Sequence, residues 1–183
     1  MEARGGDATF NDVPDFAQTL LTNTTFNADL PLPAEFTAGL SVQVTDKWLV
    51  AFDYNRAMWS AYQSLDVQFN NGLPASINPR KYKDASTYRL GTQYKANEKF
   101  TFRAGYYFDE SPVQDTYFAP ETPRNDSNAF TGGLTYQFNS KLGLDLSFLY
   151  IHFDEIDNSY DHNAQGNFGG TYNSVVFSPG IGI

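Results

Sequence analysis

The chain has 183 residues, enough for one domain, and its net charge of −9 argues against nucleic acid as a partner. It contains no cysteine, which excludes disulfides and thiol catalysis. Mean hydropathy is −0.45, and no segment approaches the ~20 apolar residues of a membrane-spanning helix.

The N-terminal part of the chain changes from an irregular segment to an alternating one. Residues 1–23 show no clear pattern and are predicted to be loop or the end of a preceding strand. From Phe26 to Val44 apolar residues occupy even positions, which indicates a β-strand with one apolar face. The parity survives Pro31 and Pro33, so we predict one long, kinked strand here.

A second even-parity run begins at Trp48 and includes Tyr54. Further along, the apolar residues fall on odd positions: Leu65, Val67 and Phe69. A β-bulge near Trp59 would shift parity in this way and give one long strand, although a second hairpin also fits. Trp59 and Tyr62 are interpreted as girdle residues of a membrane barrel, and residues 70–84 as a loop.

The segment 86–109 carries the clearest pattern of the chain. Its even positions are large and apolar, its odd positions are polar or small, and Ala96-Asn97-Glu98 suits a tight hairpin turn. Pairing Lys95 with Lys99 keeps both apolar sets on one side. The polar face holds Arg89 and Arg103 beside glycines, and the apolar face begins and ends in aromatic residues. These features are typical of a transmembrane β-barrel.

The C-terminal part continues the alternation. We expect strands over 130–138, 142–150 and 175–183, and long loops over 110–128 and 154–170. Three tight turns therefore alternate with three long connections, which is the topology of outer-membrane barrels with short periplasmic turns and long extracellular loops. The tight turns are placed at 45–47, 96–98 and 139–141. We predict an open, curved antiparallel sheet of about seven long strands, with 26–44 and 175–183 as its edges.

Several stretches resemble one known family. They are R-A-G-Y-Y-F-D-E-S-P-V from Arg103, A-P-E-T-P-R-N-D from Ala119, G-G-L-T-Y-Q-F from Gly132, D-Y-N-R-A-M-W-S from Asp53 and Y-K-D-A-S-T-Y-R-L-G from Tyr82. The chain is similar in these stretches to the FadL/TodX outer-membrane transporters for long-chain fatty acids and other hydrophobic compounds.

The resemblance implies an all-β, antiparallel transmembrane barrel, of which residues 24–183 would be the C-terminal half. The family has fourteen strands and an N-terminal hatch. Because no signal peptide is visible at Met1, we expect that one was removed or that the chain is a fragment. The implied location is the outer membrane of Gram-negative bacteria. The implied partners are hydrophobic small molecules or fatty acids, outer-membrane lipid and lipopolysaccharide.

Three basic residues are candidates for ligand binding. Arg89 and Arg103 face the polar side, where each could form an ion pair with Asp53 or Asp145, or capture a carboxylate head group. The resemblance implies that Lys83 lies near the fatty-acid head-group site; the alternative is a solvated rim lysine paired with Asp84.

No residues stand out for metal binding or catalysis. The acidic residues of 154–161 do not have the spacing of a calcium loop, and His152 and His162 are too few and too far apart for a zinc site. We therefore predict no enzyme activity, no catalytic residues and no cofactor.

Three functions compete at this point. The first is passive diffusion of hydrophobic compounds through the barrel, which the inward parity of Leu49, Leu149, Ile151 and Phe153 favours over an aqueous pore. The second is a surface barrel or adhesin that acts through its loops, and the third is a soluble β-sandwich in which two apolar faces meet.

Overall fold

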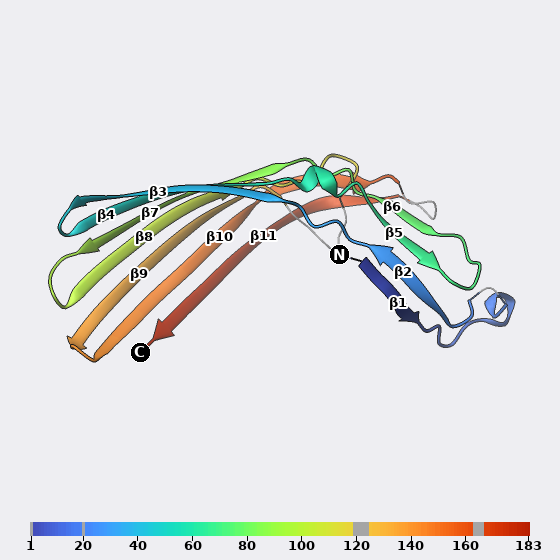
Figure 1. Cartoon of the computed structure of the whole chain (residues 1–183), viewed down its shortest axis with the longest axis horizontal. Coiled ribbons are helices and arrows are strands. Elements are labelled where there is room, and N and C mark those ends of the chain that lie inside the picture. Colours follow the sequence, from blue (N-terminus) through green and yellow to red (C-terminus); the bar gives the residue numbers. More distant parts are fainter. Residues whose placement is uncertain (1, 20, 119–124, 163–166) are drawn as a thin grey trace.

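The computed structural model describes residues 2–19, 21–118, 125–162 and 167–183. They form two antiparallel sheets, with the small sheet at the end of the large one opposite its tight turns (Figure 1). The large sheet has the order β11-β10-β9-β8-β7-β4-β3 and the small one β1-β2-β5-β6. The strands of the large sheet are β3 (Glu35–Thr45), β4 (Trp48–Ala57), β7 (Ala85–Lys95), β8 (Phe100–Asp109), β9 (Ser127–Asn139), β10 (Leu142–Tyr160) and β11 (Phe168–Gly182). Those of the small sheet are β1 (Glu2–Ala8), β2 (Thr24–Asp29), β5 (Ser64–Phe69) and β6 (Ser76–Pro79); the 3-10 helices are η1 (Asp15–Ala17) and η2 (Trp59–Ala61).

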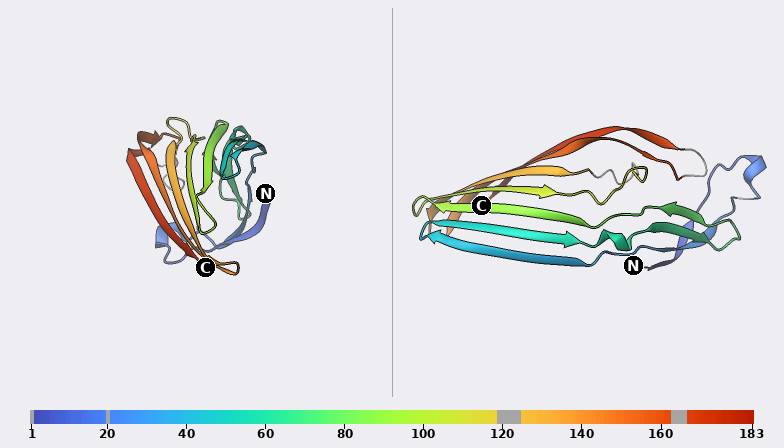
Figure 2. Two further views of the ribbon diagram at one scale, coloured as in Figure 1. Left: turned by 90° about the vertical axis from the view of Figure 1, so that its left-hand side faces the viewer. Right: turned by 90° about the horizontal axis from the view of Figure 1, so that it is seen from above.

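The large sheet has the topology that the sequence predicts. Tight turns join β3 to β4, β7 to β8 and β9 to β10, and long connections lie at the other end. The sheet is curved and open (Figure 2), with β3 and β11 as its two edges within the described residues. The prediction of an open antiparallel sheet of seven long strands is confirmed.

One face of the large sheet is apolar and uncovered. Leu40 is 68% exposed and Phe102 is 48% exposed, and many other large apolar residues of even parity are similarly accessible. A soluble monomer rarely exposes an apolar surface of this extent. The soluble β-sandwich is therefore wrong, because no second sheet covers this face in the described part of the chain. We call it the outer face, and the face that carries Arg89 and Arg103 the inner face. The described residues include no helix with the length and apolarity needed to cross a membrane.

The turn between β7 and β8 corrects the predicted register. Asn97 Oδ1 accepts the N–H groups of Lys99 at 2.8 Å and Phe100 at 3.0 Å, and Ala96 N–H donates to the Phe100 carbonyl at 3.0 Å. These bonds build a longer connection over residues 96–99. Lys95 consequently pairs with Thr101 and not with Lys99. The difference is two residues, so both apolar sets stay on the same face.

The predicted strand over 26–44 is two strands. β2 pairs with β1 and β5, whereas β3 pairs with β4, and the break falls at residues 30–34. Pro31 and Pro33 have no N–H to donate to a ladder, which explains why pairing stops there. The edge of the large sheet therefore begins at Glu35 and not at Phe26.

Two further connections differ from the prediction. β4 ends at Ala57 and is followed by η2, and β5 then pairs with β2 and β6 in the small sheet, so residues 48–69 form neither one bulged strand nor a hairpin. The predicted loop over 70–84 contains β6. The predicted loop over 154–170 is mostly strand, because β10 continues to Tyr160 and a bulge between Phe153 and Ile156 reverses its parity.

A small aromatic core lies between the long connections. Tyr62, Tyr82, Val113 and Phe118 are buried, and the rings of Tyr62 and Tyr82 meet edge to face with centroids 5.2 Å apart. Trp59 and Tyr172 pack against this group. The interpretation of Trp59 and Tyr62 as girdle residues is therefore wrong, because Tyr62 belongs to this buried group and Trp59 packs against it. We refer to Tyr62, Tyr82, Val113 and Phe118 as the loop core.

Candidate functional site

Antiparallel pairing places the polar residues of the inner face in rows across the sheet. Asp53, Arg89 and Tyr107 are successive Cα partners on β4, β7 and β8. Gln93 and Arg103 are partners in a second row, four residues further along β7. At about 3.3 Å per residue the two rows are roughly 13 Å apart. Arg89 and Arg103 thus share one face without sharing one site.

Arg89 is paired with the acidic residue directly opposite. Its Nη1 lies 2.9 Å from Asp53 Oδ2, with side-chain exposures of 47% for the arginine and 36% for the aspartate. Because these groups are cross-strand neighbours, the strand register alone brings them together. The ion pair that the sequence analysis weighed for Arg89 is therefore present, between adjacent strands of the wall.

The charge of Arg103 is less closely neutralised than that of Arg89. Its Nε donates to Gln93 Oε1 at 2.9 Å and its Nη1 to Thr135 Oγ1 at 2.6 Å, whereas Asp145 Oδ1 lies 3.8 Å from Nη1. Thr135 in turn donates a hydrogen bond to Asp145. The nearest hydrogen-bond partners of Arg103 are neutral groups, so this guanidinium keeps more capacity to attract an anion than Arg89 does.

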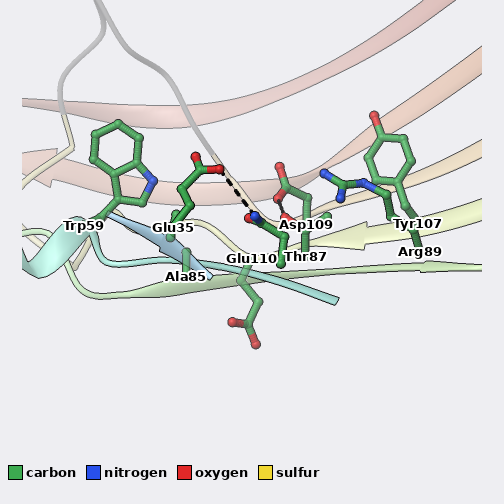
Figure 3. A pocket seen from close by; sticks show the side chains of 10 residues that line it. Glu35, Trp59, Ala85, Thr87, Arg89, Tyr107, Asp109 and Glu110 are labelled. Atoms are coloured by element: carbon green, nitrogen blue, oxygen red, sulfur yellow. Dashed lines mark hydrogen bonds between the residues drawn. The ribbon is translucent and has the colours of Figure 1, made fainter. Parts of the chain in front are cut away.

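A polar hollow of about 460 Å³ adjoins Arg89 on the inner face (Figure 3). Asn55 Nδ2 donates to Glu35 Oε2 at 3.4 Å, and Thr87 donates to Asp109. Figure 3 shows Glu110 pointing away from these side chains. Carboxylates outnumber cations around this hollow, because Glu35 and Asp109 accompany Arg89. A carboxylate ligand would be repelled here.

A second hollow, of about 470 Å³, lies beside Arg103 and Asp145. Gly133, Ser147 and Gly180 leave room in its wall. Leu149 lines it and continues along β10 into Ile151 and Phe153, which alternate to the same face and are partly buried. The inner face therefore changes from polar near Arg89 to partly apolar along β10.

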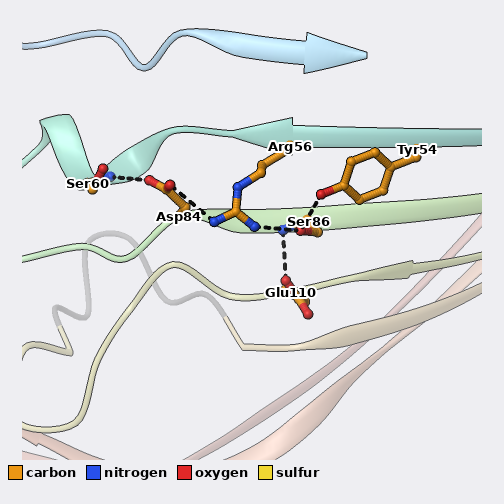
Figure 4. Close-up of polar contacts among 6 residues, drawn as sticks. All are labelled: Tyr54, Arg56, Ser60, Asp84, Ser86 and Glu110. Carbon is orange, nitrogen blue, oxygen red and sulfur yellow. Dashed lines mark hydrogen bonds and ion pairs between the residues drawn. The ribbon is translucent and has the colours of Figure 1, made fainter. Parts of the chain in front are cut away.

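Lys83 lies apart from both arginines. It is exposed in the connection before β7, and its N–H donates to the Pro112 carbonyl at 2.9 Å. The alternative pairing with Asp84 is wrong, because that carboxylate is bound by Arg56 Nη2 at 3.2 Å and by the Ser60 N–H at 3.0 Å (Figure 4). Of the three predicted residues, the structure therefore brings only the two arginines to one face.

A polar network that sequence reasoning missed closes the outer face at its long-loop end (Figure 4). Ser86 Oγ lies 3.3 Å from the Tyr54 hydroxyl and accepts a hydrogen bond of 3.5 Å from Arg56, while the Ser86 N–H donates to Glu110 Oε2 at 2.9 Å. The sequence signal for this network is that the residues at even positions change there from apolar to polar. Hydrogen bonds from Ser60, and then Arg56, lower the pKa of the Asp84 carboxyl below its ordinary value.

The described residues hold no group of three His, Cys, Asp or Glu side chains close enough to bind a metal ion. Asp154, Glu155 and Asp157 lie along β10, at its bulge and just beyond it. The geometry of the inner face can form ion pairs, hydrogen bonds and apolar contacts with a passing molecule.

An open, curved antiparallel sheet with an apolar outer face and a mixed inner face is part of the wall of a membrane β-barrel. The comparison with known families agrees. The profile described as "Outer membrane protein transport protein (OMPP1/FadL/TodX)" matches residues 4–180, and the chain belongs to this family of Gram-negative outer-membrane proteins.

Relatives and solved structures extend this result. The chain is 31% identical to outer membrane protein P1 of Haemophilus influenzae over 67% of this chain and 28% of that protein. It is 28% identical to the long-chain fatty acid transport protein of Escherichia coli K12, over 72% of this chain and 31% of that protein. It thus spans about a third of these relatives.

Two crystal structures share the fold. A Pseudomonas aeruginosa FadL homologue superposes with a TM-score of 0.73 at 21% identity, covering 88% of this chain and 37% of that one. The Pseudomonas putida toluene transporter TodX gives 0.59 at 23% identity, covering 87% and 36%. Both relations show that this chain has the fold of part of these proteins.

Proposed function

We propose that the protein carrying this chain lets hydrophobic compounds, such as long-chain fatty acids, diffuse passively across the outer membrane through a β-barrel. The observation that carries the proposal is the mixed inner face. Leu149, Ile151 and Phe153 place apolar surface on the inner side of β10, beside the hollow at Arg103. A purely aqueous pore would not favour apolar residues there. The names of the relatives support the same function, and the protein acts as a channel and not as an enzyme.

Residues 24–183 form, in this proposal, the C-terminal half of a fourteen-stranded barrel, and residues 1–23 the end of a preceding strand with its loop. The open edges β3 and β11 support this division, because unpaired edge groups are not tolerated in lipid. The apolar outer face is then covered by outer-membrane lipid, and the long loops meet lipopolysaccharide.

Among the three candidate residues, Arg103 is best suited to orient a carboxylate. Its acidic neighbour Asp145 is 3.8 Å away, whereas Arg89 is held by Asp53 at 2.9 Å. A fatty-acid carboxylate could thus take a position beside Arg103 without first displacing a close ion pair. Lys83 is exposed and would act, if at all, at the entrance among the long loops.

The test compares two ligands in vesicles that contain the full-length protein. Uptake of a long-chain fatty acid and of an uncharged hydrocarbon is followed for the wild type, for Arg103→Ala and for Lys83→Ala. We expect Arg103→Ala to reduce fatty-acid uptake more than hydrocarbon uptake. Arg56→Ala, which removes an arginine from the outer face, is the control and should change neither. Wild-type vesicles that admit neither ligand would refute the transport function, and equal effects on both ligands would refute the role of Arg103.

A further inference from the structure

The short-turn end of the large sheet carries a row of lysines. Lys47, Lys95, Lys99 and Lys141 are all exposed at the three tight turns. Asp46 and Glu98 are the acidic residues at these tips, so this rim is positive although the whole chain has a net charge of −9. Four of the six lysines of the sequence lie at this rim. This distribution separates the rim from the acidic long-loop end.

The lysine tips are held next to one another. The Lys47 ammonium donates to the Ala96 carbonyl at 3.3 Å, and the Lys95 N–H donates to the Lys47 carbonyl at 2.8 Å. The Gln137 N–H donates to the Lys99 carbonyl at 2.8 Å, which joins the next strand to the same row. These bonds hold the first two tight turns and the end of β9 side by side along the rim.

An apolar hollow lies on the outer face directly above this row. Its volume is about 460 Å³, and its outward-facing lining is Trp48, Val50, Leu90, Thr92, Ala104 and Tyr106. Thr92 and Ala104 are Cα partners, and their short side chains leave the space between larger neighbours. Unfilled space on a wall that faces lipid forfeits dispersion contacts, so an alkyl chain is favoured over water there.

The polar groups in this hollow are already satisfied within the protein. Trp48 Nε1 donates to Thr92 Oγ1 at 2.7 Å, and the Thr92 hydroxyl donates to the Leu49 carbonyl at 3.0 Å. The hollow thus offers an occupant only apolar contacts. Its occupant needs an alkyl chain, whereas the rim beside it attracts an anion.

The two features are close enough to serve one molecule. Thr92 and Lys95 are three residues apart on β7, which is about 10 Å along a strand. A glycerolipid spans this distance from its phosphate to the middle part of an acyl chain. In outer-membrane barrels the short turns lie on the periplasmic side, and clustered lysines next to a membrane attract anionic head groups. We propose that the lysine rim and the outer hollow together bind an anionic phospholipid, with the phosphate at Lys47 and Lys99 in the turns and one acyl chain in the hollow.

Trp48 supplies the probe for the test, because it lines the hollow and is exposed on the outer face. The full-length protein is placed in phosphatidylcholine vesicles with a small, equal fraction of either brominated phosphatidylglycerol or brominated phosphatidylcholine. Subtracting the signal of a Trp48→Phe variant isolates the fluorescence of Trp48. We expect brominated phosphatidylglycerol to quench Trp48 at least about fivefold more effectively than brominated phosphatidylcholine. This factor is the expected effect of one lysine near an anionic lipid surface. Raising the salt concentration should reduce this preference.

Matched variants separate the two halves of the site. Combined Lys47→Asn and Lys99→Asn should abolish the preference, whereas Lys81→Asn at the long-loop end should retain it. Ala104→Leu, which fills the hollow, should weaken quenching by both lipids, and Ala38→Leu on the same face outside the hollow should not. Equal quenching by both lipids in the wild type would overturn the proposal. A preference that survives the double lysine change would also overturn it, as would a loss of Trp48 quenching that self-association of the protein alone explains. None of these readouts depends on transport, so failure here leaves the proposed function standing.

Discussion

Replacing Leu40 by arginine tests the assignment of the outer face directly. Leu40 is the middle residue of the apolar even positions on β3, which run from Phe36 to Val44, and it is 68% exposed. An arginine on the lipid face near the middle of the bilayer costs about 2–4 kcal/mol. At about 1.4 kcal/mol for each factor of ten, the folded-to-unfolded ratio should fall by roughly thirty- to a thousandfold.

The neighbouring residue Ser41 provides the control at nearly the same depth. Its side chain points to the inner face, opposite the small Ala51 and diagonal to Asp53, which can pair with a new arginine. We expect Ser41→Arg to cost less than about 1 kcal/mol, because the inner side admits water. Denaturant titration of the full-length protein in lipid vesicles measures both, with heat-modifiable gel migration reporting the folded fraction. Equal losses for Leu40→Arg and Ser41→Arg would contradict the two-faced wall.

Three further outcomes are expected from the described contacts. Phe118 is completely buried, and Phe→Ala changes at such sites cost about 3–5 kcal/mol. Phe118→Ala should therefore expose the long connections to protease while the membrane strands stay folded. Phe16→Ala, at a site that is 86% exposed, should not change protease sensitivity. Because the pKa of Asp84 is lowered in the folded state, its carboxylate stabilises the fold at pH values above the unfolded-state pKa of about 3.9. This stabilisation is lost as the pH falls through the folded-state pKa. The stability difference between wild type and Asp84→Asn should therefore be present at neutral pH and shrink in acid; a constant difference would contradict this. A double-mutant cycle on Arg89 and Asp53 should give a coupling below about 1 kcal/mol that salt reduces, because both groups are substantially exposed; a much larger value would indicate a buried pair.

Side-chain alternation was sufficient to predict the large sheet from the sequence. Each strand of this sheet exposes one face to lipid, so the residues of that face must be apolar and keep one parity, and Leu90, Phe102 and Leu146 show this on three different strands. The prediction of the two faces was robust to the wrong register at Lys95. A shift of two residues leaves every side chain on its original side.

Alternation could not predict the segments in which a strand is interrupted, contains a bulge or gives way to a loop. The parity of 26–44 continues through Pro31 and Pro33, yet the missing N–H groups divide it between two sheets. The strand now seen as β10 was predicted to end at Tyr150 and to be followed by a loop from Asp154, because the acidic residues there suggested a loop and the bulge before Ile156 reverses the pattern. The loop core could not be predicted, because Tyr62 and Phe118 meet only in three dimensions.

The candidate site was predictable only as individual residues. The inward parity of Arg89 and Arg103 followed from alternation, and Asp53 and Asp145 were named as their partners. The difference between a close pair at Arg89 and a distant one at Arg103 depends on which strand is the neighbour. Asp53 lies directly opposite Arg89, whereas Asp145 lies two strands away from Arg103. The sequence predicted the order of these strands but not the register that places Asp53 opposite Arg89.

The direct pairing of Ala57 with Ala85 makes the wall independent of what is inserted between them. Residues 58–84 leave the large sheet and return to the same place, so the ladder between β4 and β7 forms whatever the length of this excursion. Doubling a flexible loop costs only about 0.6 kcal/mol. Segments of different length can therefore be accommodated at this position without disturbing the ladder between β4 and β7. The tip at residues 70–75 is, for the same reason, a suitable place to display a foreign peptide on the cell surface.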